Sequence, residues 1–191
     1  MLAFYVVFRA GDPGTPDLDN RTLIEATPLG WFYSAQLPCQ RRIVVFHTSG
    51  SSSAAKVARR KSGFMDILNE HSTFIRGVIE GQNYYMDDEG GTQWSKVTAA
   101  NTLRLMPFGS QEERWCAVGD AVMAFDPLSS QGMITALKCG CMLGMTLAEE
   151  TVDLGPLEMA YEGIWEDYVV HRRWFYNQVM FDEEEFWKKQ K

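Results

Sequence analysis

Residues 115–137 combine the residue types that a small ligand with hydroxyl and anionic groups requires. A short strand, expected at 115–118, ends in Gly119 and Asp120, and a glycine there allows a ligand to approach the backbone closely. A carboxylate directly after a strand end is placed to accept hydrogen bonds from a ribose or ribityl hydroxyl. The segment therefore predicts a ligand site at the end of this strand.

The second half of the same segment supplies a restrained loop and a helix start. Pro127 fixes the loop, and we expect a helix to begin near Ser129 or Ser130, with Gly132 in its first turn. Free N–H groups and a partial positive charge at a helix start favour an anion. Because Gly132 has no side chain, a flat ring system can lie against the backbone at this point.

This segment resembles the second flavin-binding motif of the FAD-dependent aromatic-hydroxylase superfamily, which reads Gly-Asp-Ala, a spacer, Pro, and Gly at a helix start. The matching positions are Gly119, Asp120, Ala121, Pro127 and Gly132. In that family the Asp holds the ribityl chain, and the Pro loop and helix start lie beside the isoalloxazine ring. The resemblance implies FAD as cofactor, with Asp120 on the ribityl chain and Pro127, Gly132 and Met133 beside the ring.

The longer form of the motif, residues 126–132, is similar to one branch of this superfamily. That branch holds the flavin-dependent halogenases, tryptophan halogenases among them, and the flavoproteins that mature quinone cofactors. Residues 172–187 also resemble the C-terminal helix of the quinone-maturation proteins, although an aromatic face packing on the core is the alternative for this tail.

A strand near the N-terminus carries a second resemblance to the same branch. Residues 30–38 resemble its Gly-Trp-x-Trp/Tyr strand, which in halogenases reads Trp-x-Trp-x-Ile-Pro. Here Tyr33 replaces the second Trp and Pro38 arrives two residues late, which weakens the halogenase interpretation. A β-hairpin with exposed aromatic side chains is the alternative. We expect Trp31, Tyr33 and Trp115 to line a substrate pocket, and the sequence singles out no catalytic side chain.

The sequence contains no G-x-G-x-x-G turn, which in dinucleotide-binding folds carries the pyrophosphate. The chain therefore resembles the C-terminal part of a flavoenzyme. We expect a substrate-domain sheet with helices in residues 1–110, the end of an FAD-binding domain in 111–152, and a C-terminal helix in 153–191.

The predicted function is FAD-dependent oxidation, most simply a monooxygenase acting on an aromatic or amino-acid-derived small molecule. The electrons would come from a flavin reductase or from NAD(P)H. A flavin-dependent halogenase is the first alternative. The second is a non-catalytic remnant or partner subunit that binds no cofactor alone.

Composition narrows the class of partner. The chain has 191 residues, 18 Lys and Arg and 25 Asp and Glu, giving a net charge of −7. Such an acidic balance argues against a nucleic-acid partner and against a membrane surface. The four cysteines lack metal-ligand spacing, so we expect no metal site and free thiols in the cytoplasm.

The elements that position these residues predict an α+β fold. Alternating and apolar runs indicate strands at 2–8, 22–27, 31–37 and 41–48, the last two as an antiparallel hairpin. The pattern turns helical over 57–79, 130–150 and 157–180; apolar residues occur on nearly all sides of the second of these helices. We expect a mixed, largely antiparallel sheet with helices, joined to the last strand and helix of a Rossmann-like FAD-binding domain.

Overall fold

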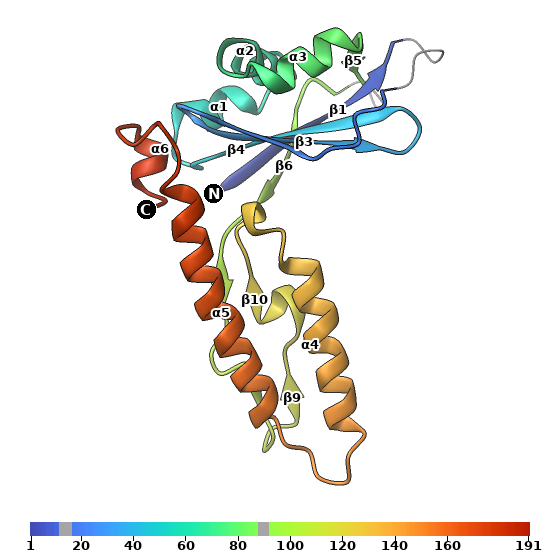
Figure 1. Cartoon of the computed structure of the whole chain (residues 1–191), viewed down its shortest axis with the longest axis vertical. Coiled ribbons are helices and arrows are strands. Elements are labelled where there is room, and N and C mark those ends of the chain that lie inside the picture. The colour runs from blue at the N-terminus through green and yellow to red at the C-terminus, as the bar shows by residue number, and fades with distance from the viewer. Residues whose placement is uncertain (12–16, 88–91) are drawn as a thin grey trace. The chain divides into compact units, whose positions relative to one another are not determined.

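The structure, a computed structural model, describes residues 1–11, 17–87 and 92–191. The chain divides into two compact units, which we call the sheet unit (residues 1–99 and 179–191) and the motif unit (residues 100–178). Both combine helices with antiparallel strands, so the expected α+β class is confirmed (Figure 1).

The sheet unit is built on a six-stranded antiparallel sheet. Its strands are β1 Leu2–Ala10, β2 Leu23–Thr27, β3 Gly30–Leu37, β4 Arg41–Thr48, β5 Tyr84–Met86 and β6 Lys96–Ala99. Their order is β2-β3-β4-β1-β5, and β6 also pairs with β1. The expected hairpin is confirmed, because β3 and β4 are antiparallel neighbours with Trp31 opposite His47.

Three helices cover one face of this sheet (Figure 1). They are α1 Ser53–Ala58, α2 Lys61–His71 and α3 Phe74–Gly81, which divide the helical pattern expected over 57–79. Alternate strand residues point to the helices, and the core contains Phe4, Phe32 and Phe46 of the strands with Phe64 of α2. All four side chains are fully buried.

Glu25 of β2 explains where α3 begins. Its carboxylate accepts hydrogen bonds from the N–H groups of Thr73, Phe74 and Ile75, at 2.6, 3.1 and 3.0 Å. The Ser72 hydroxyl donates to the same carboxylate at 2.6 Å. Burial raises the pKa of Glu25, but these hydrogen bonds outweigh it and hold the pKa below its ordinary value of 4.5. The carboxylate thus satisfies N–H groups that a helix start leaves unpaired.

A buried ion pair joins two further parts of the sheet unit. Arg42 donates to Asp17 Oδ2 from Nη2 at 2.8 Å and from Nε at 3.0 Å, and the Tyr84 hydroxyl donates to the same oxygen at 2.9 Å. The Arg42 and Asp17 side chains are 0% and 1% exposed. Burial raises the pKa of Asp17, but hydrogen bonds from the Asp19 backbone, Arg42 and Tyr84 lower it overall. Both buried charges are therefore paired.

The end of the chain returns to the sheet unit through the short helix α6 Glu185–Lys188. Phe186 and Trp187 are buried, and the Trp187 indole donates a hydrogen bond to the Thr27 carbonyl at 2.8 Å. This part of the aromatic tail packs on the core, as one of the two interpretations of the tail predicted.

The motif unit consists of short strands flanked by two long helices (Figure 1). Its elements are β7 Leu103–Arg104, β8 Gly109–Ser110, β9 Trp115–Cys116, the 3₁₀ turn η1 Gly119–Ala121, β10 Met123–Ala124, the 3₁₀ turn η2 Pro127–Ser129, α4 Gly132–Leu147 and α5 Gly155–Tyr176. The strands form two antiparallel pairs, β7 with β10 and β8 with β9. A small core of Phe108, Met123, Cys139 and Tyr161 joins them to the helices. None of the described helices is both long and apolar enough to cross a membrane.

Candidate functional site

The Gly119–Asp120 turn packs directly on helix α4. Gly119 has a φ of +60°, a left-handed conformation that side chains other than glycine rarely adopt. A Cβ atom at Gly119 would lie 3.2 Å from the Cβ of Ala136 on α4. Both the backbone conformation and the close approach therefore explain why this position carries glycine.

Asp120 and Gly132, the two ends of the motif, lie next to each other. A Cβ atom at Gly132 would lie 3.7 Å from the Asp120 Oδ1 oxygen; apart from its chain neighbours and the backbone of its own helix, it would meet no other described atom within 4 Å. Asp120 is exposed. The structure thus brings an accessible carboxylate to the open backbone at the start of α4.

The start of α4 differs in detail from the sequence-based expectation. The helix begins at Gly132, whereas we expected it near Ser129 or Ser130. Ser130 has a φ of +53°, which ends the η2 turn and separates it from α4. Gln131 occupies the N-cap position, and its side chain makes no capping hydrogen bond within the described part of the chain. The first-turn N–H groups are therefore not capped by this side chain, and Met133 is 82% exposed beside them.

The loop before α4 is organised by Asp126, which is buried. Its Oδ1 oxygen accepts a hydrogen bond from the Leu128 N–H at 3.0 Å, and Pro127 occupies the first position of the turn. Its Oδ2 oxygen accepts one from the Tyr176 hydroxyl at 2.8 Å and lies 3.5 Å from the Arg172 Nε atom. Asp126 therefore caps the turn and ties it to helix α5, rather than facing solvent as Asp120 does.

A second tyrosine of α5 holds the same loop from its backbone. The Tyr168 hydroxyl accepts a hydrogen bond from the Asp126 N–H at 3.1 Å and pairs with the Thr102 hydroxyl at 2.9 Å. The sequence predicts a helix over residues 157–180, which contains Tyr168, but it assigns this tyrosine no part in the loop. The tyrosine hydroxyl itself was the available signal, because a buried Tyr hydroxyl usually has a hydrogen-bond partner.

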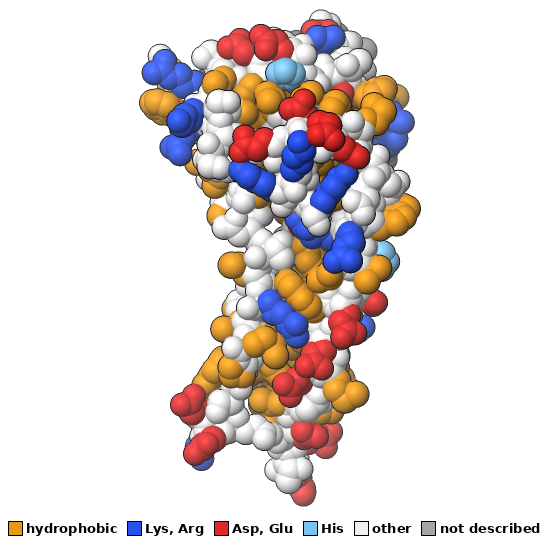
Figure 2. Space-filling model, turned by 90° about the vertical axis from the view of Figure 1, so that its left-hand side faces the viewer, with side chains coloured by type: hydrophobic (Ala, Val, Ile, Leu, Met, Phe, Trp, Pro, Cys, Tyr) orange, Lys and Arg blue, Asp and Glu red, His pale blue; other side chains and the backbone are white. Residues whose placement is uncertain are grey.

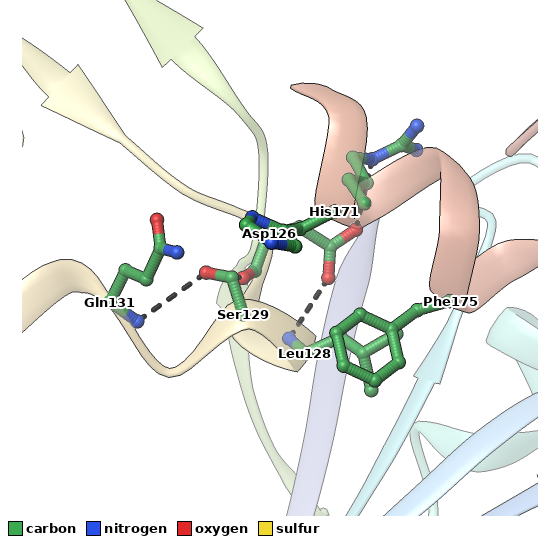
Figure 3. Close-up of a pocket in the computed structure, with 7 residues that line it drawn as sticks. Asp126, Leu128, Ser129, Gln131, His171 and Phe175 are labelled. Carbon is green, nitrogen blue, oxygen red and sulfur yellow. Dashed lines mark hydrogen bonds and ion pairs between the residues drawn. The ribbon is translucent and has the colours of Figure 1, made fainter. Parts of the chain in front are cut away.

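A cavity of about 220 Å³ opens beside this loop. Leu128, Ser129 and Gln131 line it from the loop side, and His171 and Phe175 project into it from α5 (Figure 3). The Gln131 N–H donates to the Ser129 hydroxyl at 3.4 Å, which holds the loop at the rim. The cavity therefore has an apolar part, formed by Leu128 and Phe175, and polar groups that lie next to the start of α4.

The three expected pocket residues do not lie in one unit: Trp31 and Tyr33 belong to the sheet unit, and Trp115 belongs to the motif unit. Trp31 is 2% exposed and stacks on His47, with ring centroids 3.7 Å apart. Burial lowers the pKa of His47 to about 3, so this imidazole is neutral. Tyr33 is half-buried on β3.

Trp115 lies at a different cavity of the motif unit. This cavity measures about 550 Å³ and is lined by Trp115 and Cys116 of β9 and by Leu143 and Leu147 of α4. The Trp115 indole donates to the Glu113 carboxylate at 2.9 Å. The role of these three aromatic residues as substrate contacts stays a prediction. No cluster of three or more metal-ligating side chains occurs among the residues that the structure describes.

No protein-family model and no curated protein matches the sequence. Solved structures do match the fold. The flavin-dependent halogenase CmlS is 20% identical with a TM-score of 0.76, and the match covers 100% of this chain and 34% of CmlS. The myxobacterial chondrochloren halogenase CndH, a variant of the FAD-dependent halogenases, is 19% identical with a TM-score of 0.80, over 100% of this chain and 44% of CndH.

A hydroxylase shares the fold as well. QhpG, a peptidyl tryptophan dihydroxylase essential for tryptophylquinone cofactor biogenesis, is 21% identical with a TM-score of 0.62, over 99% of this chain and 42% of QhpG. The chain thus spans less than half the length of each of these three structures. At these identities the likeness concerns the fold. The chain thus shares its fold with two flavin-dependent halogenases and a hydroxylase, as the resemblance of the Gly119–Gly132 motif predicted.

Proposed function

We propose that this chain is the part of an FAD-dependent oxidoreductase that holds the flavin end of the cofactor. The observation that carries the proposal is that Asp120 lies beside the side-chain-free position at Gly132, on a fold shared with FAD-dependent enzymes. In this proposal β9 and α4 are the last strand and helix of a Rossmann-like FAD-binding domain.

The residues at this site fit the flavin end of FAD. Asp120 is exposed and accepts hydrogen bonds, as a ribityl chain with its hydroxyl donors requires. Above Gly132 the space is open, with Met133 exposed beside it, so a flat ring has room against the backbone. The start of α4 adds a partial positive charge, which stabilises an anionic ring by about 0.3–1 kcal/mol in an exposed position.

Once reduced by a flavin reductase or by NAD(P)H, a bound flavin would supply the electrons that activate dioxygen. The chain's own residues do three other things in this proposal. Asp120 orients the ribityl chain, the helix start of α4 favours negative charge, and the Asp126 turn keeps the loop in one conformation through its bonds to α5. Preorganised groups of this kind stabilise charge without rearranging during the reaction.

The proposed reaction is oxygen insertion into an aromatic or amino-acid-derived substrate, with electrons from a flavin reductase or NAD(P)H. Halogenation by the same cofactor is the second candidate, and the TM-scores of 0.76 and 0.80 with two halogenases favour it. Tyr33 replaces the second Trp of the halogenase motif in residues 30–38, which favours oxygen insertion over halogenation. A third candidate is a subunit without catalytic activity of its own.

The proposal is tested by titrating the purified chain with flavin mononucleotide and following flavin fluorescence. We expect weak binding, because the sequence offers no G-x-G-x-x-G turn to hold a phosphate, and flavin mononucleotide probes the isoalloxazine and ribityl contacts alone. Asp120→Asn should weaken it roughly ten- to a hundred-fold, the cost of a charge-assisted hydrogen bond. Asp167→Asn, an exposed change on α5, is the control and should bind as the parent does. Equal affinities for all three proteins would contradict the proposal.

A further inference from the structure

The cavity of about 220 Å³ beside the Asp126 loop has walls that the structure holds in place. We call it the loop–α5 cavity. On one stripe of α5, Tyr168 and Tyr176 bind the loop through hydrogen bonds to Asp126. On the neighbouring stripe, His171 and Phe175 lie one turn apart and face the cavity (Figure 3). The contacts of the first stripe therefore hold the loop opposite the side chains of the second.

The size and the apolar wall of the loop–α5 cavity suit one aromatic ring. Leu128 and Phe175 form the apolar wall, and Phe175 is 44% exposed, so part of its ring faces open space. An apolar cavity of about 150 Å³ is enough to bind benzene. At about 220 Å³ the loop–α5 cavity has room for a benzene ring and one small substituent. Offset or edge-to-face packing on Phe175 favours a ligand of this kind.

The Ser129 hydroxyl selects a ligand that donates a hydrogen bond. It donates its own hydrogen to the Asp126 carbonyl oxygen at 2.9 Å. The Gln131 N–H donates to the Ser129 oxygen at 3.4 Å, which uses one of its two lone pairs. The hydroxyl therefore offers a ligand its second lone pair, as an acceptor. A phenol O–H supplies the donor that this position needs, whereas a carboxylate has no donor to give.

The remaining polar lining of the cavity suits a neutral hydroxyl as well. His171 projects into the cavity from α5 (Figure 3). An imidazole nitrogen donates or accepts, and a phenol oxygen does both, so the two groups can form a hydrogen bond in either direction. Asp126 and Arg172 are the charged residues of the lining, and the Arg172 Nε atom lies 3.5 Å from Asp126 Oδ2. Because these opposite charges face each other, the lining matches a neutral ligand.

The charges of α5 disfavour an anionic ligand. The helix has two arginines and four acidic residues, and the acidic side chains at 158, 162, 166 and 167 are exposed. Figure 2 shows acidic side chains, in red, along the lower half of the view, with apolar side chains between them. Their negative potential raises the cost of bringing a benzoate-like ligand to this helix, whereas a neutral phenol does not meet this cost.

We propose that the loop–α5 cavity binds a neutral, single-ring phenol, with the ring against the apolar wall and the hydroxyl hydrogen-bonded to Ser129 and His171. The inference rests on the proposed function and names its substrate class. Gln131 lines the cavity and directly precedes Gly132, where we place the flavin ring. A phenol in this cavity is therefore held next to the proposed flavin site, and His171 determines which ring substituent is accepted.

The test compares phenol with toluene, which is close in size but has no hydroxyl group, by amide NMR titration of the purified chain. We expect phenol to bind more tightly and to shift signals of residues 128–131 and 171–175. His171→Phe keeps a ring at this exposed position but removes the hydrogen bond. It should weaken phenol binding roughly three- to tenfold without weakening toluene binding. His71→Phe, the same change on α2 of the sheet unit, is the control and should alter neither affinity.

Folding and flavin binding are measured separately. His171 is exposed, so His171→Phe should melt at the parent's temperature. No phenol binding, tighter binding of benzoate than of phenol, or unchanged phenol binding by His171→Phe would overturn the inference. Phenol binding that depends on His171, in a chain that binds no flavin mononucleotide, would uphold the cavity's role and contradict the proposed function. Flavin binding that depends on Asp120, without phenol binding, would do the reverse.

Discussion

The sheet unit and the motif unit satisfy their apolar and polar groups in different ways. In the sheet unit, three helices close one face of the sheet over buried phenylalanines, and the Asp17–Arg42 pair has partners on every side. In the motif unit, the strands are two residues long and α4 keeps an apolar face in solvent. The sheet unit thus buries the large apolar side chains of its core, whereas the motif unit leaves those on one side of α4 exposed.

This difference follows from where each unit's hydrogen bonds and apolar contacts are made. In the sheet unit, long antiparallel strands bury alternate residues and hydrogen-bond to one another, so both kinds of contact are made within the unit. In the motif unit, Asp126 is hydrogen-bonded to Tyr168 and Tyr176 of α5, and the buried apolar cluster is smaller than that of the sheet unit. The loop that these hydrogen bonds hold leads directly into the start of α4, which we assign to the flavin.

The largest expected effect is on the free energy of unfolding, when a large apolar side chain is replaced by alanine in each unit. Phe46 is fully buried in the sheet unit, 4.8 Å from the Phe32 ring centroid, and Phe46→Ala should cost about 3–5 kcal/mol of unfolding free energy. Leu137 on α4 is 71% exposed, so Leu137→Ala should change the unfolding free energy by less than about 0.5 kcal/mol. Urea denaturation measures both. A large loss of unfolding free energy at Leu137 would mean that this side chain is already buried in the isolated chain.

A smaller effect is expected from removing the hydrogen bond that ties the Asp126 loop to α5. Tyr176→Phe removes the hydroxyl that donates to the buried Asp126 carboxylate and should cost about 1.5–3 kcal/mol. Faster amide hydrogen exchange should accompany it at residues 126–131, while the sheet unit keeps its protection. Tyr85→Phe, at a 53% exposed position, is the control and should change neither quantity. Unchanged exchange in the loop would show that α5 does not hold it.

The smallest expected effect concerns the Glu25 cap in the sheet unit. Glu25→Gln should cost about 1 kcal/mol at neutral pH, because it removes a negative charge from the start of α3. The folded-state pKa lies below 4.5, so the charge stabilises the fold above that pH and the contribution is lost as the pH falls through the lowered pKa. Denaturation curves of parent and variant should therefore converge in acid. A constant difference from neutral pH into acid would contradict this account of the cap.

Much of the sheet unit could be predicted from the sequence, because period-2 apolar patterns such as residues 41–48 report directly on a buried face. The division of residues 57–79 into helices could not, since it depends on Glu25, some fifty residues away in the chain. The start of α4 was misplaced for a local reason, the left-handed Ser130. Propensity rules give little warning of that conformation outside glycine and asparagine.

The candidate site was predicted in part. The motif placed Gly119, Asp120 and Gly132 on a strand end and a helix start, and the structure brings the last two together. The loop's dependence on Tyr168 and Tyr176 was not predicted, because it is a contact between distant parts of the chain. The assignment of residues 1–110, 111–152 and 153–191 to separate parts of a flavoenzyme, and the role of Trp31 in a substrate pocket, stay predictions.

The central claim is that a flavin lies on the open backbone at Gly132, and amide NMR spectra of the chain titrated with flavin mononucleotide test it most directly. Shifts should gather in residues 119–133 for the parent and for Gly163→Val, a control at a helical glycine whose Cβ would meet no described atom within 4 Å. Gly132→Val should fold normally and lose these shifts, because its side chain occupies the space of the ring. Shifts outside residues 119–133 in the parent, or the same shifts in Gly132→Val, would contradict the claim.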